Sequence, residues 1–224
     1  MKRKAVVIGG TSGLGLELAS LLKASHREVF ITGRRRPSDL RGTSFHQLNL
    51  SGDGYMGRIN DMFMRLGAVD TVVYAAGFSQ IGNLEELARS SIEDMIQVGL
   101  SAPTMVLRTV LQFQKKLPTF VAITSTSQWT PRADEPVYCA TKAGLAMLAE
   151  SVSLSGSIQQ TLTVGVSGMK TSFWDKVSRD TSTMLDPALV AEKIMDSLKD
   201  EYCYRFLKVL REPARVEVVR ERFT

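Results

Sequence analysis

KAVVIGGTSGLGLELASLL, residues 4–22, decides the fold class of this chain. Residues 4–8 form an apolar run of strand length, and residues 14–22 repeat apolar side chains with the period of a helix. The turn between these two segments is rich in glycine. We therefore expect a strand, a tight turn and a helix in direct succession.

The same order of strand and helix continues along the chain. Strands that alternate with helices form βαβ units, which build a parallel sheet with right-handed crossovers. The sequence thus predicts the doubly wound α/β class, with a parallel sheet flanked by helices. Residues 215–223 alternate like a last strand, whereas residues 199–213 give no clear prediction. Further strands are expected at 28–32, 45–48, 68–75, 119–124 and 161–166, and helices at 59–66, 92–115, 137–153 and 188–198.

Length and composition predict one domain over residues 1–224. Of the 224 residues, 44% are hydrophobic and 23% are charged, which suffices for one sizeable core. The chain has neither a run of about 18 apolar residues nor a signal-peptide pattern, so we expect no membrane partner and a cytoplasmic location. The spacing of the cysteines and histidines predicts no metal site.

The net charge of +5 makes an acidic partner or ligand worth considering. The densest basic run, Arg34 to Arg36, decides little by itself, because such runs are usually solvated loops. No zinc-finger spacing or RNA-recognition motif accompanies the charge. We therefore expect no nucleic-acid partner.

The glycine turn indicates a nucleotide site. Gly9, Gly13 and Gly15 lie between the first strand and the first helix, where glycines permit a tight turn and let backbone amides approach a pyrophosphate. The alternative is a tight connection that binds nothing.

The end of the second expected strand indicates which dinucleotide binds. Sites that prefer the cofactor without a 2′-phosphate carry an acidic residue there, which accepts hydrogen bonds from the ribose. This chain instead has Arg34 and Arg35, whose guanidinium groups can form charge-assisted bonds to a 2′-phosphate. The expected cofactor is NADP(H).

Tyr138 and Lys142 in PVYCATK, residues 136–142, lie one helical turn apart. A tyrosine with a pKa of about 10 is a poor acid or base near neutral pH unless a cation stabilises its phenolate. The pair is therefore a candidate acid/base in which the lysine lowers the pKa of the tyrosine. The alternative is an amphipathic helix with a packed tyrosine and a solvated lysine.

Three motifs resemble the short-chain dehydrogenase/reductase family, over Lys4 to Leu198. The glycine turn is similar to the family's TGxxxGxG, VYAAG at residues 73–77 to its NNAG segment, and Tyr138 with Lys142 to its YxxxK signature. Ser125 lies 13 residues before Tyr138, at the spacing of the family's catalytic serine.

The resemblance implies a single Rossmann-like domain and an NADP(H)-dependent oxidoreductase acting on a small-molecule carbonyl or alcohol. Tyr138 would exchange a proton with the carbonyl oxygen, Ser125 would hydrogen-bond that oxygen, and Lys142 would bind the nicotinamide ribose. The expected cofactor contacts are Gly9, Thr11, Ser12, Gly13, Leu14, Gly15, Arg34, Arg35, Asn49, Leu50, Ala75, Ala76, Gly77, Tyr138, Lys142 and Thr171.

Departures from the family pattern leave questions open. Gly99 occupies the place of the family's supporting asparagine, and we expect a water in the vacated volume, so that Gly99→Asn raises turnover or leaves it unchanged if the side chain fits. Val166-Ser167 replaces the usual Pro-Gly, although Thr171 is kept. Asn49 is expected either to contact the adenine or to cap a turn.

Aromatic residues suit a hydrophobic carbonyl substrate, but each has a packing alternative. Phe173 and Trp174 lie in the segment Ser172–Leu185, a candidate lid, and Phe78 and Trp129 flank the expected site. A rival hypothesis is a catalytically impaired dinucleotide-binding sensor or scaffold protein. The apolar helix that follows VGLSAP, residues 98–103, and the helix at 137–153 also predict a homo-oligomer.

Overall fold

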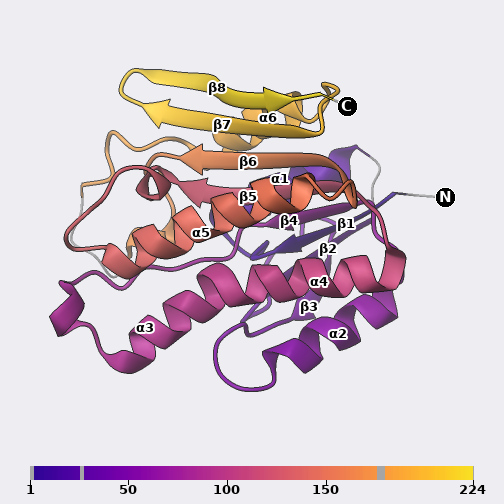
Figure 1. Ribbon diagram of the computed structural model, residues 1–224, viewed down its shortest axis with the longest axis horizontal. Coiled ribbons are helices and arrows are strands. Elements are labelled where there is room, and N and C mark those ends of the chain that lie inside the picture. Colours follow the sequence, from indigo (N-terminus) through magenta and orange to yellow (C-terminus); the bar gives the residue numbers. More distant parts are fainter. Residues whose placement is uncertain (1–2, 26–27, 176–179, 224) are drawn as a thin grey trace.

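The computed structural model describes residues 3–25, 28–175 and 180–223. Strands and helices alternate from the first residues onward, as predicted (Figure 1). The strands are β1 (Lys4–Ile8), β2 (Glu28–Gly33), β3 (Ser44–Gln47), β4 (Thr71–Tyr74), β5 (Leu117–Ser125), β6 (Ile158–Val166), β7 (Tyr204–Arg211) and β8 (Ala214–Arg222). The helices are α1 (Gly13–Ala24), α2 (Tyr55–Leu66), α3 (Arg89–Ile96), α4 (Ala102–Gln114), α5 (Pro136–Ser153) and α6 (Pro187–Ser197), with short turns η1 (Leu84–Glu86), η2 (Gln97–Ser101), η3 (Thr126–Gln128) and η4 (Ser172–Trp174).

One eight-stranded sheet runs through the molecule in the order β3-β2-β1-β4-β5-β6-β7-β8. Neighbouring strands pair in parallel from β3 to β7, which confirms the doubly wound class. The sheet is parallel except at one edge, where β8 pairs antiparallel with β7. The link between these strands, Glu212-Pro213, has room only for a hairpin.

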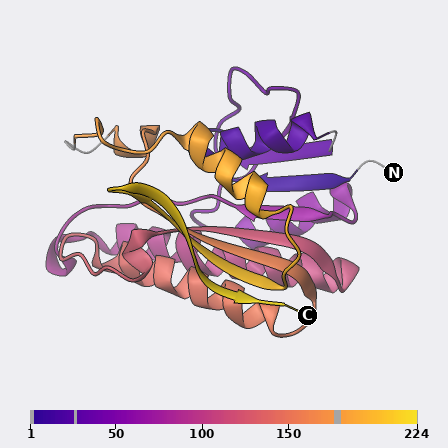
Figure 2. The ribbon, with the colours of Figure 1, turned by 90° about the horizontal axis from the view of Figure 1, so that it is seen from above.

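Helices cover both faces of the sheet (Figure 2). One core packs α2, α4 and α5 against the sheet, and the other packs α1 and α6 against the opposite face. The strands are continuous apolar runs in the sequence because both faces of the sheet are buried. In β1, for example, Val6 and Ile8 lie in the first core and Ala5 and Val7 in the second. No helix in the described part of the chain is long and apolar enough to cross a membrane.

The helix expected at 92–115 is interrupted. It consists of α3, the π-helical turn η2 and α4, and Gly99 lies in the π-helical turn. The buried hydroxyl of Tyr74, at the end of β4, donates a hydrogen bond of 2.5 Å to the carbonyl oxygen of Val98. Burial raises the pKa of Tyr74, which keeps the hydroxyl protonated as a donor.

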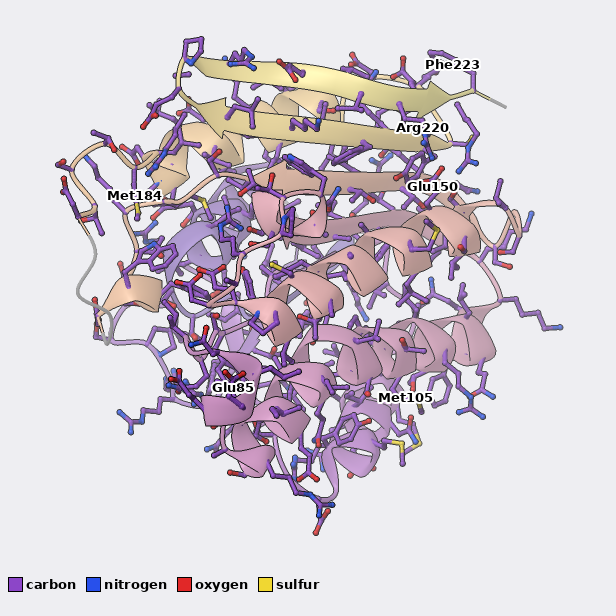
Figure 3. All side chains as sticks on the ribbon, turned by 60° about the vertical axis from the view of Figure 1, so that its left-hand side comes forward. Glu85, Met105, Glu150, Met184, Arg220 and Phe223 are labelled. Carbon is purple, nitrogen blue, oxygen red and sulfur yellow. The ribbon has the colours of Figure 1, made fainter. Side chains whose placement is uncertain are left out.

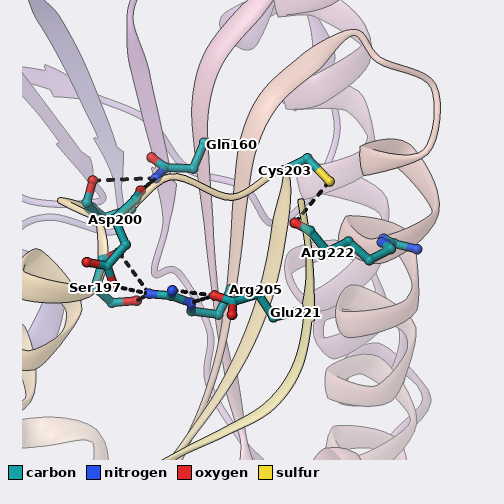
Figure 4. A network of polar contacts seen from close by, with 8 residues as sticks. Gln160, Ser197, Asp200, Cys203, Arg205, Glu221 and Arg222 are labelled. Carbon is teal, nitrogen blue, oxygen red and sulfur yellow. Dashed lines mark hydrogen bonds and ion pairs between the residues drawn. The ribbon is translucent and has the colours of Figure 1, made fainter. Parts of the chain in front are cut away.

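The C-terminal hairpin, whose second strand was expected and whose first strand had no clear prediction, is anchored by a buried arginine (Figure 4). Arg205 of β7 donates to Asp200 at 2.6 Å and to the carbonyl oxygen of Ser197 at 3.2 Å, and it pairs with Glu221 of β8. These bonds satisfy a buried guanidinium and tie the hairpin to the end of α6.

A second contact ties β8 to α5. Arg220 and Glu150 lie next to each other in Figure 3, and their side chains form an ion pair of 2.6 Å. The hairpin thus forms the edge of the sheet next to α5, the helix that carries Tyr138 and Lys142.

Candidate active site

The glycine turn after β1 packs tightly against neighbouring segments. Gly9 has a φ of +83°, and a Cβ atom there would lie 2.6 Å from the backbone nitrogen of Ala76. Gly13 has a φ of +51°, and its Cβ would lie 3.0 Å from Cγ2 of Thr171. A Cβ on Gly15 would lie 2.2 Å from the carbonyl oxygen of Gly9. Three segments expected to bind the cofactor therefore meet at the carboxyl edge of the sheet.

The amino terminus of α1 opens onto this edge. Ser12 is the N-cap residue in extended conformation, and its side chain forms no capping hydrogen bond. The first amides of a helix have no partner within the helix and carry partial positive charge. The glycine turn and the amino terminus of α1 together fit a pyrophosphate. Because glycine has no side chain, the backbone amides of the turn can come close to the phosphate groups.

The remaining expected contacts in this region have clear structural roles. Leu14 is buried in the core, and the amide of Ala75 donates to the carbonyl oxygen of Ile8 at 2.9 Å. Thr11 packs against Gly33, where a Cβ would lie 2.5 Å from the threonine side chain. The turn is thereby fixed to the ends of β2 and β4.

The end of β2 carries the two expected arginines. Arg34 and Arg35 are exposed, and Gln47 donates to the backbone oxygen of Arg34 at 3.1 Å. Within the described residues neither guanidinium group takes part in an ion pair, so both are available to an anion. No group of three histidine, cysteine or acidic side chains in that part of the chain could hold a metal ion.

Asn49 and Leu50 follow β3. The side-chain oxygen of Asn49 accepts a hydrogen bond of 3.1 Å from the amide of Ser51, so this residue caps a turn, which was one of the two alternatives. Leu50 is buried, and its carbonyl oxygen accepts from Gln97 at 2.7 Å.

α5 and β5 bring the three expected catalytic residues together. Lys142 is 5% exposed, its Nζ lies 5.5 Å from the centre of the Tyr138 ring, and it donates to the carbonyl oxygen of Ile123 at 3.1 Å. A Cβ on Gly77 would lie 3.2 Å from the same Nζ, so the VYAAG segment passes close to the lysine. Ser125 ends β5, and its side chain lies close enough to Tyr138 to oppose the rise in the pKa of that hydroxyl through a hydrogen bond.

Burial dominates the electrostatics of the pair. It raises the pKa of the Tyr138 hydroxyl well above its usual value, an effect that Ser125 and Arg132 oppose and Glu135 reinforces. The pKa of Tyr138 is thus raised, not lowered as the sequence led us to expect. Burial also lowers the pKa of Lys142 to about 8.

One of the expected aromatic residues lies against Tyr138. The rings of Phe173 and Tyr138 are 5.9 Å apart, and Trp174 stacks edge-on against Phe173 at 4.9 Å. The lid hypothesis covered Ser172–Leu185, of which residues 176–179 lie outside the described residues.

The other expected aromatics pack within the fold. Trp129 lies 5.7 Å from the ring of Phe206, with Lys208 Nζ 4.5 Å above it, and Phe78 packs against the core. For these two residues the packing alternative therefore describes the structure.

Sequence reasoning missed a polar cluster beside Ser125. Ser127 and Glu135 are each 4% exposed, and Arg132 lies between them. A signal was present, since an arginine and a glutamate three residues apart stand between the expected catalytic serine and tyrosine.

Comparison with known proteins finds oxidoreductases among the relatives. An uncharacterized oxidoreductase of Myxococcus xanthus is 28% identical over 163 residues, which cover 67% of this chain and 64% of that protein. The chain thus spans about two thirds of the length of the curated relatives that it first matches.

Solved structures share the fold. A short-chain dehydrogenase/reductase from Vibrio parahaemolyticus is 28% identical with a TM-score of 0.71, over 86% of this chain and 91% of that one. An alcohol dehydrogenase from Thermococcus sibiricus, complexed with 5-hydroxy-NADP, is 21% identical with a TM-score of 0.82, over 97% of this chain and 100% of that one. The family model of the short chain dehydrogenases matches residues 3–181, and the chain therefore belongs to the short-chain dehydrogenase/reductase family.

Proposed function

We propose that the protein is an NADP(H)-dependent oxidoreductase that interconverts a carbonyl and an alcohol. One observation carries the proposal. Tyr138, Lys142 and Ser125 lie together at the carboxyl edge of the sheet, where the VYAAG segment links them to the glycine turn. A protein that only binds a dinucleotide has no need for a proton donor, a cation and a hydroxyl in one place.

When bound, the cofactor supplies or accepts a hydride. The Tyr138 hydroxyl, kept protonated by burial, gives its proton to the substrate oxygen during reduction and takes one back during oxidation. The Ser125 hydroxyl donates to the same oxygen, which carries most negative charge in the transition state. Lys142 holds the ribose and provides the positive charge that stabilises the tyrosinate once the proton has left.

Arg34 supports the choice of NADP(H). Its side chain is exposed at the end of β2 with no ion pair among the described residues, so no neighbour there competes for an added phosphate. Arg35 beside it supplies a second positive charge, and no acidic residue directly follows β2.

Phe173 supports an apolar or aromatic carbonyl as the substrate. Its ring lies against Tyr138, and an apolar substrate group beside it would be sheltered from water. The proposed substrate is thus a small molecule.

We also propose that the protein forms a homo-oligomer through α4 and α5. Phe113 of α4 and Met147 of α5 are 54% and 62% exposed, and the helices lie side by side on one face of the sheet (Figure 1). Exposed apolar side chains on neighbouring helices suit a self-complementary interface.

A screen tests the proposed function. NADPH oxidation is followed with a panel of aldehydes and ketones, beside fluorescence titrations of NADPH and NADH. We expect at least one carbonyl to be reduced and NADPH to bind more tightly. Tight NADPH binding with no reduction across the panel would instead favour a sensor or scaffold.

A further inference from the structure

The hydroxyl of Ser125 sits in a network that restricts where its proton can point. Its oxygen accepts a hydrogen bond of 3.2 Å from the backbone amide of Ser127, and the hydroxyl oxygens of the two serines are 3.1 Å apart. The direction of the bond between the two hydroxyls decides whether Ser125 can donate to a substrate.

Arg132 restricts the hydrogen bonds that the Ser127 hydroxyl can form. Arginine can only donate hydrogen bonds, and its Nη1 is bonded to the Ser127 oxygen, so it takes one of the two acceptor positions of that hydroxyl. The single proton of Ser127 is then directed either to Ser125 at 3.1 Å or to the carboxylate of Glu135 at 3.4 Å. The shorter contact favours Ser125.

Two donors from Ser127 fill the acceptor capacity of Ser125. With the amide and the hydroxyl of Ser127 both pointing at its oxygen, the proton of Ser125 has to be donated elsewhere. The remaining direction leads out of the network towards the Tyr138 hydroxyl, which lies within hydrogen-bond reach of Ser125.

We propose that Ser127, held by Arg132, is a positioning residue that orients the Ser125 hydroxyl as a hydrogen-bond donor towards the substrate oxygen. This inference rests on the proposed function, because it assigns Ser127 a role only through Ser125.

The competing explanation is that the cluster merely fastens the loop between β5 and α5. Arg132 also donates to the Thr126 hydroxyl at 2.8 Å and lies 3.8 Å from Glu135, which would tie the loop together without affecting Ser125. A purely structural cluster would affect the protein equally whether or not Ser125 keeps its hydroxyl.

A double-mutant cycle separates the two explanations. Parent, Ser127→Ala, Ser125→Ala and the double variant are compared by kcat and KM for the best carbonyl of the panel, by NADPH affinity and by melting temperature. Ser127→Ala should lower kcat about 10-fold, while NADPH affinity changes less than about twofold, since one lost orienting hydrogen bond costs roughly 1.4 kcal/mol. In the Ser125→Ala background it should have no further effect on kcat.

Arg132→Gln and Arg132→Lys provide a second measurement that keeps the Ser127 hydroxyl. Gln, whose shorter and neutral amide is a weaker donor, should lower kcat in the Ser125 parent but not in Ser125→Ala, and Lys, which keeps a charged donor, should recover most of the loss. The exposed pair Arg89 and Glu93 supplies the control, because Arg89→Gln removes an equivalent charge from a solvent-exposed ion pair without an expected change in kcat.

Equal losses of kcat in both backgrounds, or an unchanged kcat in Ser127→Ala, would overturn the positioning role and leave the proposed function intact. A parent protein that reduces no carbonyl would overturn both. The melting temperatures identify a variant whose lost activity comes from unfolding. In that case the two Arg132 variants distinguish the positioning role from the purely structural one.

Discussion

Gly99 lies directly against Thr141. A Cβ atom on the glycine would come within 2.6 Å of the threonine Cβ and 2.8 Å of its hydroxyl oxygen. Thr141 is buried, and its hydroxyl donates to the carbonyl oxygen of Tyr138 at 2.9 Å. The glycine therefore permits close packing of η2 on α5 and leaves no volume for a water molecule. The expectation that a water replaces the missing asparagine side chain is wrong.

Gly99→Ala should destabilise the protein by about 1–3 kcal/mol, because the added methyl group forces η2 and α5 apart. Gly99→Asn should be worse, and turnover should fall rather than rise. Gly57→Ala in α2 is the matched control, since a Cβ there meets nothing within 4 Å, and it should be neutral or stabilising by up to about 1 kcal/mol. Urea unfolding measures all three; equal stabilities for Gly99→Ala and the parent would contradict the packing argument.

Arg34→Ala should remove most of the preference for NADPH over NADH. A charge-assisted contact to the 2′-phosphate contributes roughly 1.5 to 3 kcal/mol, or about 10- to 150-fold in affinity. Arg108→Ala, which removes the same charge from the exposed face of α4, should leave the preference unchanged. Fluorescence titration of both cofactors gives the ratio, and a variant that retains it would exclude Arg34 as the phosphate ligand.

Lys142→Met should stabilise the protein at pH 7. Burial lowers the pKa of Lys142 from 10.5 to about 8, so folding opposes protonation, and below pH 8 the protonated lysine costs up to about 3 kcal/mol. Between about pH 8 and 10.5 the unfolded chain binds a proton that the folded chain lacks, and the stability of the parent rises with pH.

The advantage of Lys142→Met should therefore shrink between pH 8 and 10. The free energy of unfolding is measured in urea at several pH values, with the same substitution at the exposed Lys116 as the control. A constant difference between parent and Lys142→Met over this range would show that burial does not lower the pKa of the lysine.

Met147→Arg should break the proposed oligomer. The side chain is 62% exposed on α5, so the substitution costs the monomer little but places charge in the proposed interface. Light scattering should show the parent at a multiple of 24.7 kDa and the variant at a smaller mass. A parent that runs only as a 24.7 kDa species at micromolar concentration would refute the interface.

Much of the fold could be read from the sequence because local signals agree with tertiary structure there. The apolar run of β1, buried on both faces, and the glycine turn that follows predict the first βα unit correctly. β7 was missed, since Arg205 and Lys208 lie three residues apart among its apolar residues and break the period of two that predicts a strand.

The site was less predictable from the sequence, because its properties depend on contacts that local patterns do not report. Spacing alone brings Tyr138 and Lys142 onto one helix face, but their pKa values depend on burial, which involves segments far away in sequence. The contact of Gly99 with Thr141 and the cluster around Ser127 likewise arise between elements or within an irregular loop, where no periodic pattern reports them.

The central claim is that Tyr138 supplies the proton that accompanies hydride transfer. Its most direct test is a single-turnover measurement of NADPH oxidation by the parent and Tyr138→Phe with the same accepted carbonyl, beside NADPH titrations of both. The substitution removes one oxygen and keeps the ring beside Phe173. The account predicts that oxidation falls at least about 100-fold while NADPH affinity is largely retained. Oxidation by Tyr138→Phe at the rate of the parent would contradict it.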